Sequence, residues 1–388
     1  MLSDLLRRRT GFEVELMAPA GSSRRVLAVE LARRHGGRVR PVWHHDSEPS
    51  LVPGLGHFLH LTQGFEVVNA AGALVCTLVD DVTLVADLDQ RIAPTSGWYR
   101  VLTDEPRLLR LLAARIDPGA PIDSSLDAVA ELWGVDVERH SGVFRLDDAA
   151  GSTIALAAPQ GGGRERGCEV IAPPLTAGHE AALDDLLRVA QELGFFVPTE
   201  AAVHVHHDGS PFRSAAALAN VVRLFGWWRP TLHTLLGTNP ACRRLAPLPA
   251  SLVGAADPGN GAASYEELRA AATDGGLTKF FDVNLTALFA DNPPRNTLEV
   301  RILPGAIDAR DIVNGAAMVE ALLDRCLADS PIPPPPRDEG AALAALREMA
   351  SAVPALLAEH VISGGSSDLR QGRRAGPGGS VANQASRE

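Results

Sequence analysis

The chain has 388 residues, 46% of them hydrophobic, which is enough to bury the core of one large domain or of two ordinary ones. Its formal net charge of -11 provides no electrostatic attraction to nucleic acid or to an anionic membrane, so we expect neither as a partner. The four cysteines lie far apart and lack Cys-x-x-Cys spacing, which argues against a zinc ribbon and against a dense disulfide framework.

Strand-like alternation of apolar and polar residues starts near the beginning of the chain and recurs along it, with helical patterns in between. In chain order, the predicted strands cover residues 11–17, 64–69, 73–79, 168–172, 202–207, 280–286 and 296–303. The predicted amphipathic helices cover residues 24–35, 181–193, 214–228, 264–272 and 309–327. No internal repeat and no regular βαβ spacing is present, which favours an α+β fold with a mixed or antiparallel sheet and helices on one face.

The segment 85–165 is predicted to be an inserted subdomain, because it has helical patterns of its own at 106–115 and 126–133 and a hairpin-like stretch. The prolines at 331–336 indicate a stiff linker, and a final helix is expected over 341–360. The expected parts are a main domain at 1–330 that carries the insert, the proline-rich linker and C-terminal helix at 331–362, and a disordered tail at 363–388.

Three of the predicted strands each carry two polar side chains two residues apart. These pairs are Glu13 and Glu15, His204 and His206, and Glu299 and Arg301. Residues i and i+2 of a strand share one face, so the members of each pair project together while their apolar neighbours point the other way. We therefore expect one face of the sheet to pack on helices and the other to form a charged cleft.

This combination of side chains suits a site for divalent cations and phosphate. Mg²⁺ is usually held by a few carboxylates together with substrate phosphates, and Glu13, Glu15, Glu169 and Glu299 would supply the carboxylates. The planar guanidinium of Arg301 can bind a phosphate or a carboxylate in bidentate fashion. The set fits phosphoryl transfer, in which a protein mainly positions groups and neutralises charge.

Six short motifs occur in an order that is typical of one known family. They are Gly-Phe-Glu-Val-Glu ending at Glu15, Asp80-Asp81-Val-Thr-Leu, Glu169-Val-Ile-Ala-Pro-Pro-Leu, His204-Val-His206, Val-Asn-Leu-Thr-Ala-Leu around Asn284, and Thr297-Leu-Glu-Val-Arg-Ile. With them the chain resembles the amidoligase family, a branch of the carboxylate-amine ligase superfamily that includes glutamine synthetase and glutamate-cysteine ligase. The resemblance covers about residues 11–327, apart from the insert.

The resemblance implies a fold and a reaction for the main domain, which would be catalytic. The fold is a curved, mostly antiparallel sheet of the glutamine synthetase and glutamate-cysteine ligase type, with helices packed on its convex face. The concave face would hold ATP and two or three Mg²⁺ or Mn²⁺ ions. A substrate carboxylate would attack the γ-phosphate to give an acyl phosphate, which an amine would convert to an amide. The substrates would be an amino acid, a peptide or a cell-wall-related compound.

The resemblance also implies metal ligands. Glu15 and Glu169 would bind the ion nearer the carboxylate substrate. Glu13, His204 and Glu299 would bind the ion that bridges the phosphates of ATP.

Further residues receive catalytic and nucleotide-binding roles from the resemblance. Arg301 would stabilise charge on the transferring phosphoryl group, and Asp81 would act near the amine or an ion. His206 and Asn284 would contact the nucleotide, although a packing histidine and a sheet hydrogen bond are equal alternatives for them. Arg243 and Arg244 lie roughly where the family has an arginine, and by resemblance they would contact a substrate carboxylate or phosphate. Lys279, the single lysine, is expected on the surface.

Two other functions stay open. The run from His204 through His206 to Asp208 can begin a binuclear zinc site, as in a metal-dependent hydrolase. A non-catalytic binding module of the same fold is the second alternative. The start of the chain lacks an export signal and no apolar run reaches the roughly 18 residues of a membrane helix, so we expect a cytoplasmic protein. Whether it forms a homo-oligomer is left open.

Overall fold

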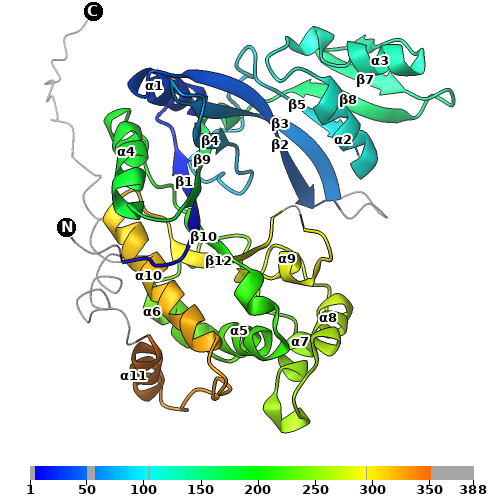
Figure 1. Ribbon diagram of the computed structural model, residues 1–388. Coiled ribbons are helices and arrows are strands. Elements are labelled where there is room, and N and C mark those ends of the chain that lie inside the picture. The colour runs from blue at the N-terminus through cyan, green and yellow to red at the C-terminus, as the bar shows by residue number, and fades with distance from the viewer. Residues whose placement is uncertain (1–4, 50–56, 104, 294, 351–388) are drawn as a thin grey trace, which may run out of the picture.

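The computed structural model describes residues 5–49, 57–103, 105–293 and 295–350. Over these residues the chain has an α+β fold around one twelve-stranded sheet, in which neighbouring strands pair antiparallel (Figure 1). The predicted α+β class with an antiparallel sheet is thereby confirmed.

The strands follow the order β11-β12-β10-β1-β9-β4-β3-β5-β8-β7-β6 across the sheet, and β2 pairs with β3. In chain order they are β1 (Thr10–Met17), β2 (Arg38–Pro49), β3 (His57–Val68), β4 (Leu74–Val79), β5 (Tyr99–Thr103), β6 (Glu138–His140), β7 (Val143–Asp147), β8 (Thr153–Pro159), β9 (Gly167–Leu175), β10 (Ala202–Asp208), β11 (Val283–Asn284) and β12 (Thr297–Pro304).

The predicted helices of the main domain are all present, within a few residues at each end. The described α-helices are α1 (Arg24–Arg34), α2 (Pro106–Arg115), α3 (Asp127–Trp133), α4 (His179–Glu192), α5 (Ala215–Trp227), α6 (Arg229–Leu236), α7 (Ala250–Ala255), α8 (Tyr265–Asp274), α9 (Thr286–Phe289), α10 (Ala309–Cys326) and α11 (Glu339–Met349).

The apolar face of the central strands packs on helices. Phe12, Val14 and Leu16 of β1 are fully buried and belong to one hydrophobic core with apolar residues of α1, α4, α5 and α10. Burial of such side chains contributes roughly 1.5–3 kcal/mol each, which fixes which face of β1 turns inward. Glu13 and Glu15, which alternate with these residues, consequently project from the opposite face.

A second hydrophobic core lies between α2, α3 and the strands β5, β7 and β8. The long pair of β2 and β3 runs towards this part of the fold (Figure 1). β3 pairs with β4 through residues 65–68 and with β5 through residues 59–62, and its Leu61 is buried in the second core. Residues 99–159 therefore have a core of their own, while the domain boundaries themselves stay predictions.

The strand predictions were incomplete or wrong in several places: β5 was not predicted, and β3 begins at His57 rather than at residue 64. β2 was not predicted, since its prolines are unusual in a sheet interior; among the described residues it pairs only with β3, and an edge strand tolerates proline. The strand expected at 280–286 shrinks to β11, because Asn284 Oδ1 accepts hydrogen bonds from the backbone N–H (3.1 Å) and the hydroxyl (2.7 Å) of Thr286. This turn leads directly into α9.

The proline-rich segment 331–336 lies against the main core. Ile332 is 1% exposed and its backbone N–H donates to Asn220 Oδ1 (2.9 Å), while Trp228 Nε1 donates to the carbonyl of Pro333 (2.8 Å). The final helix, α11, ends at Met349, and the remainder of its predicted span and the predicted tail lie outside the described residues.

Arg24 of α1 is a buried charged residue that connects α1 by hydrogen bonds to β3 and to the segment 164–167. Its guanidinium donates to the carbonyls of Gln63 (3.0 and 3.1 Å), Arg164 (2.8 Å) and Gly167 (3.1 Å), and it lies 4.5 Å over the ring of Trp98. We expect Arg24→Met to lower the free energy of unfolding by about 3–5 kcal/mol, because three buried carbonyls lose their donor.

Urea unfolding of Arg24→Met and of the exposed neighbour variant Arg25→Met measures this loss. The second variant should stay within about 0.5 kcal/mol of the unchanged protein. Equal midpoints for both variants would show that the Arg24 contacts contribute nothing.

Candidate functional site

The register of neighbouring strands brings the predicted pairs onto one face of the sheet. Glu13 of β1 is directly opposite His204 of β10, and Glu15 is opposite Glu169 of β9. Directly opposed residues of an antiparallel pair share a face, with Cβ atoms roughly 5 Å apart. These side chains therefore meet although they are far apart in the chain.

β12 completes the same face. His206 of β10 is opposite Glu299 of β12, and the register of the two strands then shifts next to His204. Such a bulge changes the direction in which a side chain points. Arg301 lies beside the shift, with its Nη1 3.5 Å from Nδ1 of His204.

A cleft of about 240 Å³ is lined by Glu13, Glu169, His204, Glu299 and Arg301. Glu15, His206 and Asn284 are not among its lining residues. Most of the residues assigned from the sequence are among those that line it, together with several that were not assigned. The full set is Glu13, His44, Asp46, Asp80, Asp81, Glu169, Ile171, His204, Arg244, Lys279, Phe280, Arg295, Glu299 and Arg301.

Glu13, His204 and Glu299 form the tightest group. One potential ligand atom from each lies within 4.8 Å of the other two. Nδ1 of His204 is 3.2 Å from Oε2 of Glu13 and 3.6 Å from Oε1 of Glu299. His206 adjoins the group, since its Nε2 is 3.0 Å from Oε1 of Glu13. Two carboxylates and an imidazole thus converge on one point.

Glu299 is held in place from both sides. Asn284 Nδ2 donates to its Oε2 at 2.7 Å, and Arg301 Nη1 donates to its Oε1. The other end of the Asn284 amide is used in the turn before α9. Asn284 therefore positions Glu299, and its predicted contact with a nucleotide stays a prediction.

Nearby positive charges keep Glu13 and Glu299 of the Glu13, His204 and Glu299 group ionised. Burial opposes ionisation of Glu13, but the positive charge of His206 and hydrogen bonds from His204 and His206 hold the pKa of Glu13 well below its usual range. For Glu299, burial is likewise outweighed by the charge of Arg301, so its pKa is lowered. The pKa of His206 is raised, because Glu13 overcomes the effect of burial.

Glu15, Glu169 and Asp81 form a second, more acidic group. Glu15 is 2% exposed, and its Oε2 accepts a hydrogen bond of 2.7 Å from the backbone N–H of Ala202. Its Oε1 lies 3.3 Å from Nε2 of His204, so Glu15 contacts the ring nitrogen that faces away from Glu13. A carboxylate in this position fixes the orientation of a metal-binding histidine.

The carboxyls of Glu15, Glu169 and Asp81 are buried and close together, so they cannot all be ionised at once. Burial, followed by the charge of Asp81, raises the pKa of Glu15 well above its usual range. Burial, followed by the charges of Glu13, Asp81 and Glu15, does the same for Glu169. Asp81 is the ionised member, since hydrogen bonds from Thr83 and Glu15 outweigh burial and lower its pKa.

Both groups fit divalent cations. Carboxylate oxygens with one imidazole are donors that Mg²⁺ and Mn²⁺ accept. Metal ligands must be deprotonated, so a cation bound beside Glu15 and Glu169 would replace protons that the crowded carboxyls otherwise retain. Six carboxyl groups line the cleft against four basic side chains, Arg244, Lys279, Arg295 and Arg301, so acidic groups outnumber basic ones there.

Asp208 does not join the two histidines of its motif. It lies at the end of β10, where its Oδ1 accepts hydrogen bonds from the backbone N–H (3.0 Å) and hydroxyl (2.8 Å) of Ser210. His207 points away from the cleft, as expected, and burial lowers its pKa to about 3. The geometry therefore does not favour the binuclear zinc arrangement.

Several lining residues come from segments that the sequence analysis did not assign to a site. His44 and Asp46 lie on β2, and Lys279, Phe280 and Arg295 lie in loops near β11 and β12. Lys279 is exposed, as expected, yet it also lines the cleft. His44, His45 and Asp46 follow one another without apolar alternation, so the sequence carries no clear strand signal for β2.

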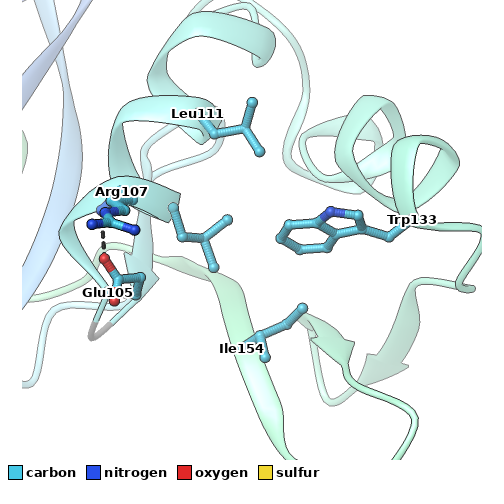
Figure 2. A pocket seen from close by; sticks show the side chains of 6 residues that line it. Glu105, Arg107, Leu111, Trp133 and Ile154 are labelled. Atoms are coloured by element: carbon cyan, nitrogen blue, oxygen red, sulfur yellow. Dashed lines mark hydrogen bonds between the residues drawn. The ribbon is translucent and has the colours of Figure 1, made fainter.

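A different pocket lies in the part of the fold that contains α2 and α3. Trp133 faces Leu111 and Ile154 across it, and Glu105 and Arg107 lie at its side (Figure 2). Its lining is largely apolar, and the single carboxylate, Glu105, accepts a hydrogen bond of 2.8 Å from the backbone N–H of Arg107. The pocket offers no group of ligands comparable to the cleft.

Comparisons with known proteins identify one family. A family model described as "Putative amidoligase enzyme" matches residues 6–323. Neither a curated protein nor a solved structure matches the chain. Among the described helices, none combines the length and the apolar composition needed to cross a bilayer.

Proposed function

Because this chain belongs to the amidoligase family, we propose that it is an ATP- and Mg²⁺-dependent ligase that joins a carboxylate to an amine. The observation that carries the proposal is the convergence of Glu13, His204 and Glu299 within 4.8 Å, next to Arg301, in an acidic cleft. Phosphoryl transfer needs this combination of cation ligands and a guanidinium.

The sheet would be of the glutamine synthetase type, with the cleft on its concave face. Its support is the division of β1 into an apolar face packed on helices and a charged face on the cleft. At about 240 Å³ the cleft is smaller than the ~300–1,000 Å³ of typical ligand sites, so we expect it to take the phosphates and the reacting groups of the substrates rather than the whole nucleotide.

Each group of ligands has its own task in this proposal. Glu13, His204 and Glu299 would hold the ion on the phosphates of ATP, and Glu169 with Glu15 would hold the ion nearer the carboxylate substrate. Bound Mg²⁺ or Mn²⁺ supplies charge neutralisation and alignment for an in-line displacement.

The remaining residues act on the substrates. Arg301 would bind the transferring phosphoryl group and stabilise its charge while the substrate carboxylate attacks. Asp81, ionised beside Glu15, would lie near the amine that then displaces phosphate from the acyl phosphate. The four free cysteines support a cytoplasmic location.

A screen for ADP release tests this function. The purified chain is incubated with ATP, Mg²⁺ or Mn²⁺, a pool of amino acids, peptides and cell-wall precursors as carboxylates, and a pool of amines. We expect ADP release that requires both pools and stops when EDTA removes the cation. Turnover with zinc and without a nucleotide would instead support a hydrolase, and ADP release that ignores both pools would contradict ligation.

A further inference from the structure

β2 contributes side chains to the cleft that the proposed metal and phosphate chemistry does not use. His44 and Asp46 are two residues apart on this strand, so both face the cleft, whereas His45 faces the other way. Asp46 is 8% exposed, and its Oδ1 lies 3.6 Å from Nη1 of Arg244. The guanidinium of Arg244 lies 4.7 Å from the centre of the Phe280 ring, which fixes this side of the cleft.

His44 is neutral and has anionic neighbours on several elements. Burial lowers its pKa, and the positive charge of Lys279 acts in the same direction. The carboxylates of Asp46, Asp80 and Asp81 act in the opposite direction without overcoming burial. The neutral imidazole of His44 can accept a proton, and the surrounding carboxylates stabilise the imidazolium that results.

Amide formation requires such a proton acceptor. An alkylamine near neutral pH is an ammonium ion, which has no electron pair for attack on a carbonyl carbon. The carboxylates near His44 attract a cation of this kind, while Asp80 is itself bound by Arg164 and Gln160. The cleft therefore offers an ammonium substrate both attraction and a neutral base.

We propose that His44 is the catalytic base that takes a proton from the ammonium form of the amine substrate; this inference rests on the ligase function proposed above. The imidazole accepts one proton from R–NH₃⁺, and the freed electron pair forms the bond from nitrogen to the carbonyl carbon of the acyl phosphate. The bond from that carbon to the phosphate oxygen breaks, its electron pair leaves with the phosphate, and the phosphate takes the second nitrogen-bound proton as HPO₄²⁻.

His44→Gln tests this role, with His45→Gln as the matched control from the same strand. Product formation is measured with the carboxylate found by ADP release, using methylamine or hydroxylamine as the amine. Methylamine is almost wholly protonated near neutral pH and needs the base, whereas hydroxylamine is largely neutral and does not. We expect His44→Gln to lower kcat about 10²-fold or more with methylamine and only a few-fold with hydroxylamine.

Three results would overturn the inference. They are an equal loss with both amines, no loss with either, and a wild type that uses hydroxylamine but not methylamine anywhere between about pH 6 and 9. In each case, continued acyl phosphate formation, seen as carboxylate-dependent ADP release, would leave the ligase function standing. Absence of ADP release from the wild type would instead refute the ligase function itself. Matched thermal unfolding of the two variants excludes a folding defect.

Discussion

Arg301→Ala is expected to lower the rate of ADP formation by about 10³-fold or more, the effect typical of removing an arginine that binds a transferring phosphoryl group. Arg301 is 9% exposed, its guanidinium donates to Glu299, and its Nη1 lies 3.5 Å from Nδ1 of His204. Burial acts against its charge, yet Glu299, Glu13 and Glu15 together raise the pKa of Arg301. Arg301 therefore stays charged throughout the neutral pH range.

Two further variants separate this catalytic effect from loss of structure. Arg301→Lys keeps the charge beside Glu299 but lacks the planar fork, so we expect a stable protein that remains about 10²-fold slower or more. Arg40→Ala removes an exposed arginine of β2 that pairs with Glu66, and it should leave ADP formation unchanged. If Arg301→Ala forms ADP at the wild-type rate at saturating ATP, Arg301 has no part in the mechanism.

The pairs of polar residues two positions apart could be predicted, because strand geometry fixes the face on which each side chain lies. Once Phe12, Val14 and Leu16 are buried, Glu13 and Glu15 have to share the other face. The same parity places His204 of β10 and Glu299 and Arg301 of β12 at the cleft, and it puts His206 beside Glu13. The order of the motifs in the chain, and not any one of them, indicated the family that the chain belongs to.

The side of the cleft built by β2 could not be found in this way. Pro41 within the strand and the polar run that follows it do not read as a buried strand, since the pattern gives no apolar alternation to follow. His44 reaches the cleft because β2 pairs along the whole of β3, a register that depends on the partner strand. The same dependence applies to Glu169, whose neighbours come from β1 and β4.

Glu169→Gln is expected to stabilise the metal-free protein while weakening its stabilisation by Mg²⁺. Burial and the charges of Glu13, Asp81 and Glu15 raise the pKa of Glu169 in the folded protein above its unfolded value. The folded protein therefore binds more protons than the unfolded chain. Stability from this group is fully present below the usual glutamate pKa and is lost as pH rises through the folded pKa. Glutamine mimics the protonated form at every pH.

The expected result is a higher unfolding temperature for Glu169→Gln than for the wild type in EDTA at about pH 8, corresponding to roughly 1–3 kcal/mol. This difference should shrink as pH falls below the raised pKa of Glu169, where the carboxyl of the wild type is itself protonated. Added Mg²⁺ should raise the unfolding temperature of the wild type, because only the folded state binds the ion. It should raise that of the variant less, because only the group of Glu13, His204 and Glu299 keeps all its ligands. Glu66→Gln, a half-buried glutamate of β3 that pairs with Arg40, should keep the response of the wild type to Mg²⁺. A variant that is less stable than the wild type in EDTA at high pH, or that responds to Mg²⁺ as strongly as the wild type, would show that the carboxyls around Glu169 are not a cation site.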